Sequence, residues 1–518
     1  MSSHNTLRLF KKLTGILASC LILALPKIGD AQVVGPVPSP FEIFQQNGVA
    51  NMAAIGDTLW VGPGMNRNIG NRAEWFLPVN ADSVVDGRGR LFSIELAPDT
   101  VFAGIGFNKE VGDGDTEQTA MGYYRSIDGG NQWEFIPFPL EEQNDSTYLY
   151  GGVELEKLPV VVPEQSPPFE VDFLGNTVLS VNWASGLIRS TDFGTTWDRV
   201  ILPPSTVDRL TPENFTPFVF DPLRDNNFLG FGLLIEPDST VWVGTAGGLN
   251  ISNNALSAPL DSVSWQHIGF NGQSNGLLSN WIITIKKQPD TDRIWLTNWI
   301  ANANEGEFGL VYTEDGGQTF TQVLRGNRVF DVGFKDGAIF VASDNGLFIS
   351  RDDGKSWKLV SQIRSANTFI KSSAEVLSLA STTKRIWVGT EDGLASSDDG
   401  GDSWDIQRVN VPLSGGNQIQ PDAPDVESFA YPNPFSRRQH ELVRIKFEVD
   451  DPGNVTINLY DFGMNHIRTL EDNQFGAGTY EAVWDGTDGQ GRLVANGVVF
   501  YRIELPSNTA NGKILVLD

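Results

Sequence analysis

A twelve-residue pattern recurs along this chain and restricts its fold more than any other feature of the sequence. The pattern reads Gly-Leu/Tyr-x-x-Ser/Thr-x-Asp-x-Gly-x-x-Trp/Phe, and intact copies occupy 122–133, 186–197, 309–320, 346–357 and 393–404. A further copy starts at Gly248 and has Asn254 where the others have aspartate. Asp and Ser side chains bond to nearby backbone N–H groups in turns, and Gly permits a positive φ, so each copy predicts a tight turn between strands.

A short run rich in β-branched and aromatic residues precedes each copy of the turn pattern. Seven such runs occur, and they begin at Leu59, Val101, Val178, Val241, Ile294, Ile339 and Ile386. Asp128 and Asp399 are 271 positions apart over five repeat steps, so one unit takes about 54 residues, the length of a four-stranded sheet with its loops. Because such a sheet cannot bury both faces alone, the units are predicted to stack in a ring.

The turn pattern resembles the Asp-box, or BNR, repeat of sialidases, sortilin-type receptors, xyloglucan-degrading enzymes and a plant-type photosystem assembly factor. The resemblance implies an all-β fold with a β-propeller over residues 32–412. Seven runs imply seven blades; six is the alternative, because no turn pattern follows the first run. In those families the box lies on the outer side of the blade, away from the usual site. The residues expected to form turns, and not to catalyse, are Asp128, Asp192, Asp315, Asp352 and Asp399.

The loops on the opposite face of the predicted propeller are where we expect a site, since function concentrates in loops carried by a rigid scaffold. Two loops are enlarged, 106–121 and 298–308, and three tryptophans outside the repeat register map to the same face. Ring faces and carboxylates together suit a glycan or a protein partner. The alternative is that these tryptophans cover neighbouring blades. The candidate binding residues are Trp183, Trp281, Trp299, Glu305, Glu307, Asp113 and Asp115.

Metal and cofactor chemistry has little support in the sequence. Asp113, Asp115 and Glu117 offer oxygen ligands for Ca²⁺, and the alternative is a solvated acidic tip. The four histidines are scattered and the single cysteine, Cys20, lies near the N-terminus. We therefore predict no cofactor other than this Ca²⁺ alternative.

The net charge of −27 argues against nucleic acid or an anionic membrane as a partner, since both require clustered positive charge. The Phe-Arg-Ile-Pro motif of sialidases is absent. Xyloglucan-type enzymes place two carboxylates between two tandem propellers, and only one propeller is predicted here. Three functions remain: binding of a glycan or an extracellular protein, a propeller-type glycoside hydrolase, and an architectural surface protein without catalysis.

The first 31 residues have the layout of a secretory signal peptide. Arg8, Lys11 and Lys12 precede an apolar run, 13–25, which is shorter than the ~20 residues that a membrane span requires. Small residues before Gln32 predict cleavage after Ala31, which leaves no transmembrane segment in the mature chain. The alternative is a lipoprotein, because 17–20 reads Leu-Ala-Ser-Cys like a bacterial lipobox.

The C-terminal region begins after a linker rich in Pro, Gly and Ser at 413–427. Residues 428–518 alternate apolar and polar positions between Gly/Asp turns, which predicts a small antiparallel sandwich. Ordered motifs stand at 431–435 (Tyr-Pro-Asn-Pro-Phe), 459–461 (Leu-Tyr-Asp), 476–478 (Gly-Ala-Gly), 484–486 (Trp-Asp-Gly) and 496–498 (Asn-Gly-Val).

These motifs resemble the C-terminal type IX secretion sorting domain, which is related to the immunoglobulin-like fold of flagellar hook-capping proteins. The resemblance implies a Gram-negative protein that is secreted or displayed on the outer cell surface after passing the periplasm. It also implies outer-membrane secretion machinery as a partner of 428–518. The family often ends in Lys, whereas this chain ends in Asp518, and a retained structural domain is the alternative.

Overall fold

The computed structural model describes residues 37–39, 47–70, 75–77, 89–112, 114–301, 305–365, 368–408 and 427–518. The predicted signal peptide, its cleavage site and nearly all of the predicted linker lie outside these residues. The described chain divides into two compact units. The propeller unit comprises 37–39, 48–361 and 375–402, and the C-terminal unit comprises 47, 362–374, 403–408 and 427–518.

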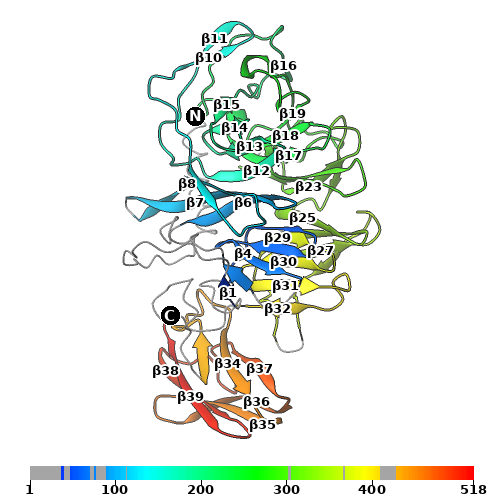
Figure 1. Ribbon diagram of the computed structural model, residues 1–518. Helices are drawn as coiled ribbons and strands as arrows, with labels where there is room; N and C mark the ends of the chain where they lie inside the picture. Colours follow the sequence, from blue (N-terminus) through cyan, green and yellow to red (C-terminus); the bar gives the residue numbers. More distant parts are fainter. Residues whose placement is uncertain are drawn as a thin grey trace. The chain divides into compact units, whose positions relative to one another are not determined.

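Seven antiparallel sheets of four or five strands form in the described residues up to 407 (Figure 1). The strands of each sheet are given in the order of hydrogen-bonded neighbours. The first sheet contains β2 (Met52–Ile55), β3 (Thr58–Val61), β4 (Asn66–Ile69), β5 (Trp75–Leu77) and β1 (Val37–Ser39), and the second contains β6 (Arg90–Ala97), β7 (Thr100–Gly112), β8 (Asp115–Ser126) and β9 (Glu134–Pro137). The third contains β12 (Pro168–Leu174), β13 (Thr177–Asn182), β14 (Gly186–Ser190) and β15 (Asp198–Val200).

The fourth sheet contains β17 (Gly230–Ile235), β18 (Val241–Thr245), β19 (Leu249–Ser252), β20 (Trp265–Ile268) and β16 (Arg209–Leu210), and the fifth contains β21 (Trp281–Lys287), β22 (Ile294–Trp299), β23 (Gly309–Thr313) and β24 (Thr321–Val323). The sixth contains β25 (Val329–Lys335), β26 (Ala338–Ser343), β27 (Gly346–Ser350) and β28 (Lys358–Val360). The seventh contains β29 (Val376–Ser381), β30 (Ile386–Thr390), β31 (Gly393–Ser397) and β32 (Asp405–Gln407). A separate hairpin pairs β10 (Thr147–Tyr150) with β11 (Val153–Glu156).

The first strands of these sheets contact one another in a closed cycle, which runs β2, β6, β12, β17, β21, β25, β29 and back to β2. Where the cycle closes, Val49 N donates to the carbonyl of Thr390 at 3.0 Å, and the Ser378 hydroxyl donates to the carbonyl of Val49 at 2.8 Å. The prediction of an all-β chain containing a propeller is therefore confirmed. We call β2, β6, β12, β17, β21, β25 and β29 the inner strands.

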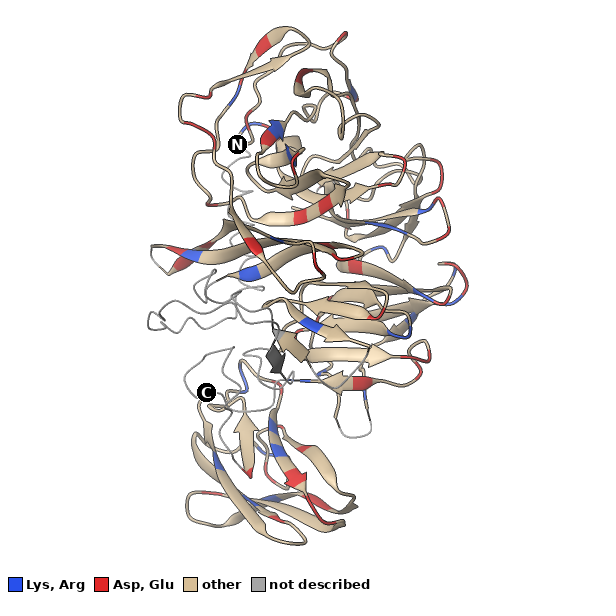
Figure 2. Cartoon of the chain, in the orientation of Figure 1, with Lys and Arg blue, Asp and Glu red and all other residues tan. Residues whose placement is uncertain are grey.

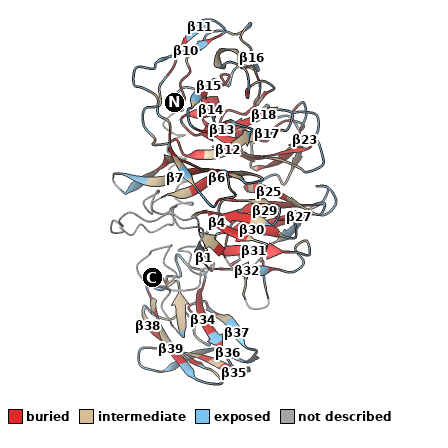
Figure 3. Cartoon of the chain, viewed as in Figure 1, coloured by how far each residue is buried: buried red, intermediate tan, exposed pale blue. Residues whose placement is uncertain are grey.

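The second strands hold the apolar runs that the sequence analysis singled out. Every residue of β18 and of β30 is buried, and β30 is drawn in red in Figure 3. Strands buried on both faces carry continuous apolar runs and do not alternate. This explains why Trp242-Val-Gly and Trp387-Val-Gly interrupt an otherwise alternating sequence.

The repeated turn has the same hydrogen bonds at each copy. Around Asp128, the Ser126 hydroxyl donates to the carboxylate at 2.8 Å, and Gln132 N donates to it at 2.9 Å. Gly130 N donates to the Ser126 hydroxyl at 2.9 Å. The other four aspartates accept the equivalent Ser or Thr hydroxyl at 2.7–2.9 Å. All five carboxylates are thus engaged within their own turns.

Gly130 is required at its position for two reasons. Its φ is +85°, and a Cβ there would lie 2.2 Å from the ring of Trp60 in the preceding sheet. A Cβ added to Gly194 would lie 2.9 Å from Phe102, and one added to Gly317 would lie 2.9 Å from Ile251, each in the preceding sheet. The turn of one sheet therefore packs against side chains of the sheet before it.

The C-terminal unit contains two facing sheets with one shared core. One sheet is β33 (Ser428–Tyr431), β34 (Val443–Val449) and β37 (Gly478–Trp484), and the other is β36 (His466–Phe475), β35 (Gly453–Tyr460), β38 (Gly497–Glu504) and β39 (Thr509–Val516). Ile445 and Trp484 of the first sheet pack with Ile457 and Ile503 of the second, and all four are buried.

Helices are confined to two single turns among the residues that the structure describes, the 3-10 helices η2 (Asn226–Phe228) and η3 (Leu260–Ser262). In this part of the chain we find no apolar helix of the length that a membrane span requires.

Candidate functional site

The three candidate tryptophans come together at one end of the inner strands, and their side chains are buried. Trp183 is 6 % exposed, Trp281 2 % and Trp299 7 %. The rings of Trp183 and Trp281 lie 5.8 Å apart, and Phe231 fills the space beside both, at 4.9 and 5.2 Å. These side chains form a hydrophobic cluster that joins several sheets.

Trp299 is held by polar as well as apolar contacts. It lies opposite Trp281 in the register of β21 and β22. Its Nε1 donates to the carbonyl of Val329 at 2.6 Å, and the guanidinium of Arg328 sits 4.3 Å from its ring. Direct contact of the three tryptophans with a ligand stays a prediction. In the structure, their side chains pack together and join neighbouring sheets.

The candidate acidic residues of the described chain lie in two different loops. Glu305 and Glu307 lie near the tryptophans, because Gly306 between them pairs with Ser279, two residues before Trp281. Glu307 pairs with Arg325 at 2.8 Å, and Glu305 is exposed nearby. Asp115 is exposed at the tip of the β7–β8 hairpin, and Asp113 lies outside the described residues. In the ranges that the structure describes, no group of three or more His, Cys, Asp or Glu residues is placed to hold a metal ion.

A β-bulge recurs near the start of six inner strands. The residues left out of the pairing register are Phe92, Phe169, Phe231, Ile283 with its neighbour Thr284, Phe330 and Leu377. Phe92 and Phe169 are 6.1 Å apart, and Phe169 and Phe231 are 5.6 Å apart. Because a bulge re-aims side chains, the repeated bulge places an apolar residue at the same level of consecutive inner strands.

In three inner strands, the residue that follows the first bulged position makes a hydrogen bond to the next inner strand. The Ser93 hydroxyl donates to the carbonyl of Pro168 at 2.8 Å, and the Thr284 hydroxyl donates to the carbonyl of Phe330 at 2.9 Å. Asp331, at the equivalent place, accepts a hydrogen bond from Leu379 N at 2.8 Å. These bonds fix the level of one sheet relative to its neighbour.

A charged cluster, which sequence reasoning missed, lies further along the inner strands. Lys286 of β21 is surrounded by Glu95, Glu170, Asp172 and Asp331 of other inner strands, whose negative charges raise the pKa of Lys286 above its ordinary value although burial alone would lower it. Asp172 also accepts a hydrogen bond from Ile235 N at 2.6 Å. Red bands mark the two acidic positions of β12 in Figure 2.

The four carboxyl groups resist ionisation because they sit inside the ring. Burial raises the pKa of Glu170 to about 8, and the charges of Glu95 and Asp331 act in the same direction. Burial also raises the pKa of Glu95, Asp172 and Asp331. One lysine therefore faces four carboxyl groups whose pKa values are raised by burial.

A sequence signal for this cluster exists. Each member is a charged residue inside an otherwise apolar run, as in Leu-Phe-Ser-Ile-Glu at 91–95 and Trp-Ile-Ile-Thr-Ile-Lys at 281–286. Such a residue in a buried strand requires a partner of opposite charge. The sequence does not identify that partner, because Glu95 and Lys286 are distant in the chain.

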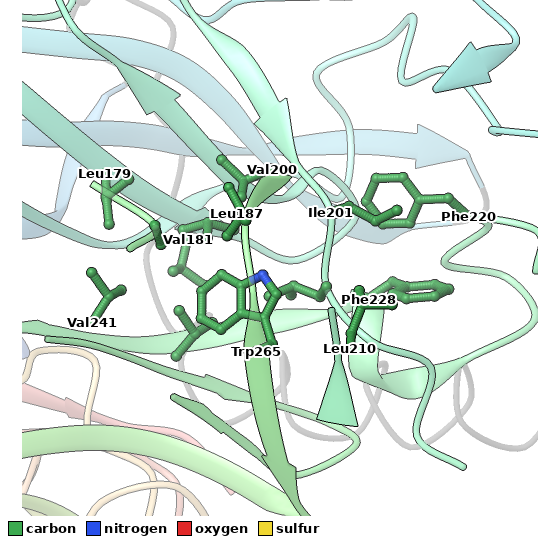
Figure 4. Close-up of a cluster of buried hydrophobic side chains, with 14 of the residues drawn as sticks. Leu179, Val181, Leu187, Val200, Ile201, Leu210, Phe220, Phe228, Val241 and Trp265 are labelled. Carbon is green, nitrogen blue, oxygen red and sulfur yellow. The ribbon is translucent and has the colours of Figure 1, made fainter. Parts of the chain in front are cut away.

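A second notable surface is the insertion platform, which we define as residues 138–167 and which contains the β10–β11 hairpin (Figure 1). Tyr148 donates from its hydroxyl to the carbonyl of Leu260 at 3.2 Å, and Tyr150 donates to that of Val263 at 2.9 Å. Both tyrosines belong to the buried cluster around Trp265 that Figure 4 shows in part.

Ion pairs hold the rest of the platform in place. Lys157, whose side chain is 5 % exposed, pairs with Glu141 at 2.9 Å and with Asp145 at 2.7 Å. Arg199 of β15 reaches the same Glu141 at 3.0 Å. The platform is therefore a fixed part of the propeller unit.

The outer side of the platform is apolar and acidic. Six of the eleven exposed large apolar side chains of the propeller unit belong to it: Leu140, Leu149, Val153, Leu158, Val161 and Val162. Exposed acids, Glu142, Glu154 and Glu156 among them, lie between these residues. In the described part of the propeller unit, no Phe, Tyr or Trp is among the exposed large apolar side chains.

No protein-family model matches the chain, and no curated protein sequence matches it. Three solved structures similar to it are propeller proteins. PorZ, an essential surface component of the type-IX secretion system of Porphyromonas gingivalis, is 15 % identical with a TM-score of 0.42, over 92 % of this chain and 60 % of PorZ. The Niastella koreensis GH74 enzyme is 13 % identical with a TM-score of 0.49, over 94 % and 75 %. YCF48 bound to D1 peptide is 14 % identical with a TM-score of 0.40, over 73 % and 98 %.

This chain thus spans 60 % of the length of PorZ. Likeness at these identities assigns no activity to it. The class of protein defined by the fold is an all-β propeller followed by a second, smaller β unit.

Proposed function

We propose that this chain is an exported, non-catalytic β-propeller that binds a protein partner through the insertion platform. The observation that carries the proposal is the set of six exposed aliphatic side chains on a segment anchored by buried tyrosines and ion pairs. Exposed apolar residues that cluster on a rigid surface are typical of protein interaction sites, and the surrounding acids favour a partner with a basic rim.

A protein partner is favoured over a glycan because of what lies at the surface. Sugars stack their CH faces on exposed aromatic rings, whereas Trp183, Trp281 and Trp299 are buried. A hydrolase requires two carboxyl groups facing a substrate. In the described part of the propeller unit, four of the five carboxyl groups with a raised pKa surround Lys286 inside the ring. The fifth, Glu375, lies 3.9 Å from the guanidinium of Arg328 in an ion pair.

Export remains part of the proposal. The signal peptide at 1–31 carries the chain to the periplasm, and residues 428–518 pass it to outer-membrane secretion machinery, so that it is secreted or displayed on a Gram-negative cell surface. Deletion of 428–518 is expected to leave the propeller in the periplasm. Arrival of the shortened chain in the medium would show that this region is no sorting signal.

Site-specific photo-crosslinking in the producing bacterium tests the platform. The full-length chain carries p-benzoylphenylalanine in place of Leu149 or Val162, which are 52 % and 51 % exposed, or of the control Leu359, which is 43 % exposed on β28. We expect one discrete adduct from each platform position and none from Leu359. Equal labelling at all three positions, or none at either platform position, would contradict the proposal.

A polysaccharide panel separates the alternatives. We expect the purified chain to show neither retention on polysaccharides nor release of reducing sugar. Retention without release would replace the protein partner by a glycan, and release would make the chain a hydrolase.

A further inference from the structure

The C-terminal unit contains a buried polar network built around Glu481 of β37. The side chains of Arg408 and Glu481 are 2 % and 5 % exposed, and that of Arg444 on β34 is 1 % exposed. Charged side chains are almost never buried to this extent without partners. The three residues therefore depend on one another.

The contacts of this network are specific. Glu481 Oε2 accepts from Arg408 Nη1 at 3.0 Å and from Arg444 Nη1 at 3.4 Å, and the Tyr431 hydroxyl donates to Oε1. Both arginines donate from Nη2 to the same carbonyl oxygen, that of Phe369, at 2.8 Å. The guanidinium of Arg444 also lies 4.9 Å from the ring of Phe369.

The network joins residues from both sides of the predicted linker. Phe369 and Arg408 precede it in the chain, whereas Tyr431, Arg444 and Glu481 follow it. A second contact crosses the same division, since the Ser373 hydroxyl donates to Glu441 at 2.5 Å. Residues 362–374 and 403–408 accordingly group with the C-terminal sandwich in one compact unit.

Separation of the two sides would break the contacts that cross the linker. Arg408 would lose Glu481, and Glu481 would keep one arginine in place of two. The Phe369 carbonyl would lose both of its guanidinium donors. Removal of one member of the network by substitution, with the two sides still packed together, is strongly unfavourable because the remaining charge stays buried and poorly solvated.

We propose that the surface formed by Tyr431, Arg444 and Glu481 is a docking site for 368–374 and Arg408 of the same chain, so that the sandwich stays bound when the linker is cut. A cleaved chain then behaves as a non-covalent complex of two fragments. This inference does not depend on the proposed partner of the propeller, and it assigns the sandwich a retained role in addition to any role in export.

The test uses the full-length protein with a specific protease site inserted in 409–426. After complete cleavage at micromolar concentration, we expect the two fragments to elute as one species in size-exclusion chromatography. Salt screens buried ion pairs only weakly. Co-elution should therefore persist in 0.5 M NaCl, where the Debye length is roughly half its value in physiological buffer. Complete separation of the wild-type fragments would overturn the proposal.

Arg408→Met removes the contact from the first fragment and leaves the interior of the sandwich unchanged. We expect the apparent Kd between the fragments to rise at least about tenfold, which corresponds to roughly 1.4 kcal/mol. The matched control is Arg468→Met, since Arg468 pairs with Asp485 within the second fragment and is 35 % exposed. An unchanged Kd for Arg408→Met would show that the network does not hold the fragments together.

A folding defect in Arg408→Met would show as a changed near-UV spectrum of the uncut protein. In that case Thr368→Val replaces it, because Thr368 Oγ1 donates to Glu481 Oε2 at 2.5 Å and valine keeps the shape of the side chain. The expected rise in Kd is smaller, about threefold, because across the linker the variant loses the hydrogen bond to Glu481 and the long one, 3.5 Å, that Arg444 Nη1 donates to Thr368 Oγ1. No rise would again contradict the proposal.

Discussion

Arg189 donates from Nη1 to the carbonyl oxygen of Ala255 at 2.6 Å and so connects one sheet of the propeller to the repeated turn of the next. The acceptor is the residue directly after Asn254, which stands at the aspartate position of the pattern. The same contact, from an arginine to the carbonyl that follows the turn aspartate or asparagine, recurs between Arg67 and Gly129, Arg125 and Phe193, Arg293 and Asp353, and Arg351 and Gly400.

This recurrence gives the turn pattern a structural purpose. The Ser and Asp side chains hold the turn in one conformation, and the carbonyl that this conformation exposes receives an arginine from the neighbouring sheet. The hydrogen bonds of these aspartates lie within their own turns. The repeat therefore records how neighbouring sheets join.

Replacement of Arg189 by alanine tests the importance of this contact. Arg189 is 7 % exposed and donates to the carbonyls of both Ala255 and Ala258. Because the variant leaves these carbonyls without their donor, we expect a loss of about 2 kcal/mol in the free energy of unfolding, measured by urea titration. Arg224→Ala is the control, since Arg224 pairs with Asp221 at an exposed site, 69 % accessible, and should change stability by less than about 0.5 kcal/mol.

The turn aspartates predict how the protein responds to acid. Hydrogen bonds from the backbone N–H and hydroxyl of Thr319, at 2.9 and 2.7 Å, lower the pKa of Asp315 to about 2. A carboxyl group whose pKa is lowered by folding stabilises the fold above its ordinary pKa and loses that contribution as the pH falls towards 2. Asp315→Asn should therefore be less stable than wild type at pH 5, by up to about 1 kcal/mol because the group is exposed.

The difference between wild type and Asp315→Asn should shrink on going from pH 5 to pH 2, as followed by thermal unfolding at each pH. A difference that stays constant over this range would mean that Asp315 contributes through its shape and not through its charge.

How far the sequence predicts this fold depends on whether the determining contacts are local. The turns around Asp128 and Asp315 were predictable because Ser or Thr, Asp and Gly within a few positions of one another satisfy each other. The inner-strand bulges were not predictable from the sequence. Phe169 and Phe330 are distinguished from their neighbours only by the way the inner strand pairs with the next strand. The charge cluster depends on residues as far apart as Glu95 and Asp331.

The candidate site shows the same division. The spacing of Trp183, Trp281 and Trp299 predicted that they share one end of the sheets, and their rings do lie in one cluster. Their burial depends on Phe231 and Arg328, which neighbouring sheets supply. Exposure is a property of packing between distant segments, so the sequence pattern alone does not determine it.

Trp299 is consequently expected to contribute to stability. Trp299→Ala removes a side chain that is 7 % exposed, together with its hydrogen bond to Val329 and its contact with Arg328. We expect a loss of about 3 kcal/mol or more, measured by urea unfolding. Trp299→Phe keeps most of the packing and should lose less than half as much. Equal losses in the two variants would assign the effect to the hydrogen bond alone.

Lys286 provides the last prediction, a dependence of stability on alkaline pH. Burial raises the carboxyl pKa of Glu170 to about 8, above its ordinary value of 4.5. A carboxyl group whose pKa is raised by folding stabilises the fold below its ordinary pKa, and that contribution is lost as the pH rises from about 4.5 to about 8. In wild type Lys286 limits this loss, because its positive charge faces Glu170 and Asp331 and its own raised pKa keeps it protonated throughout the range.

Lys286→Met removes that compensation and leaves the acids facing one another. At pH 5, where Glu170 is largely neutral, we expect the variant to lose less than about 1 kcal/mol relative to wild type, and at pH 8.5 about 2 kcal/mol or more. Thermal unfolding across pH 5 to 9 measures both curves, with Lys335→Met as a control, since Lys335 pairs with the exposed Asp336. Because only charge repulsion among Glu95, Glu170, Asp172 and Asp331 makes the penalty grow with pH, parallel curves for Lys286→Met and wild type would mean that the lysine acts by filling space.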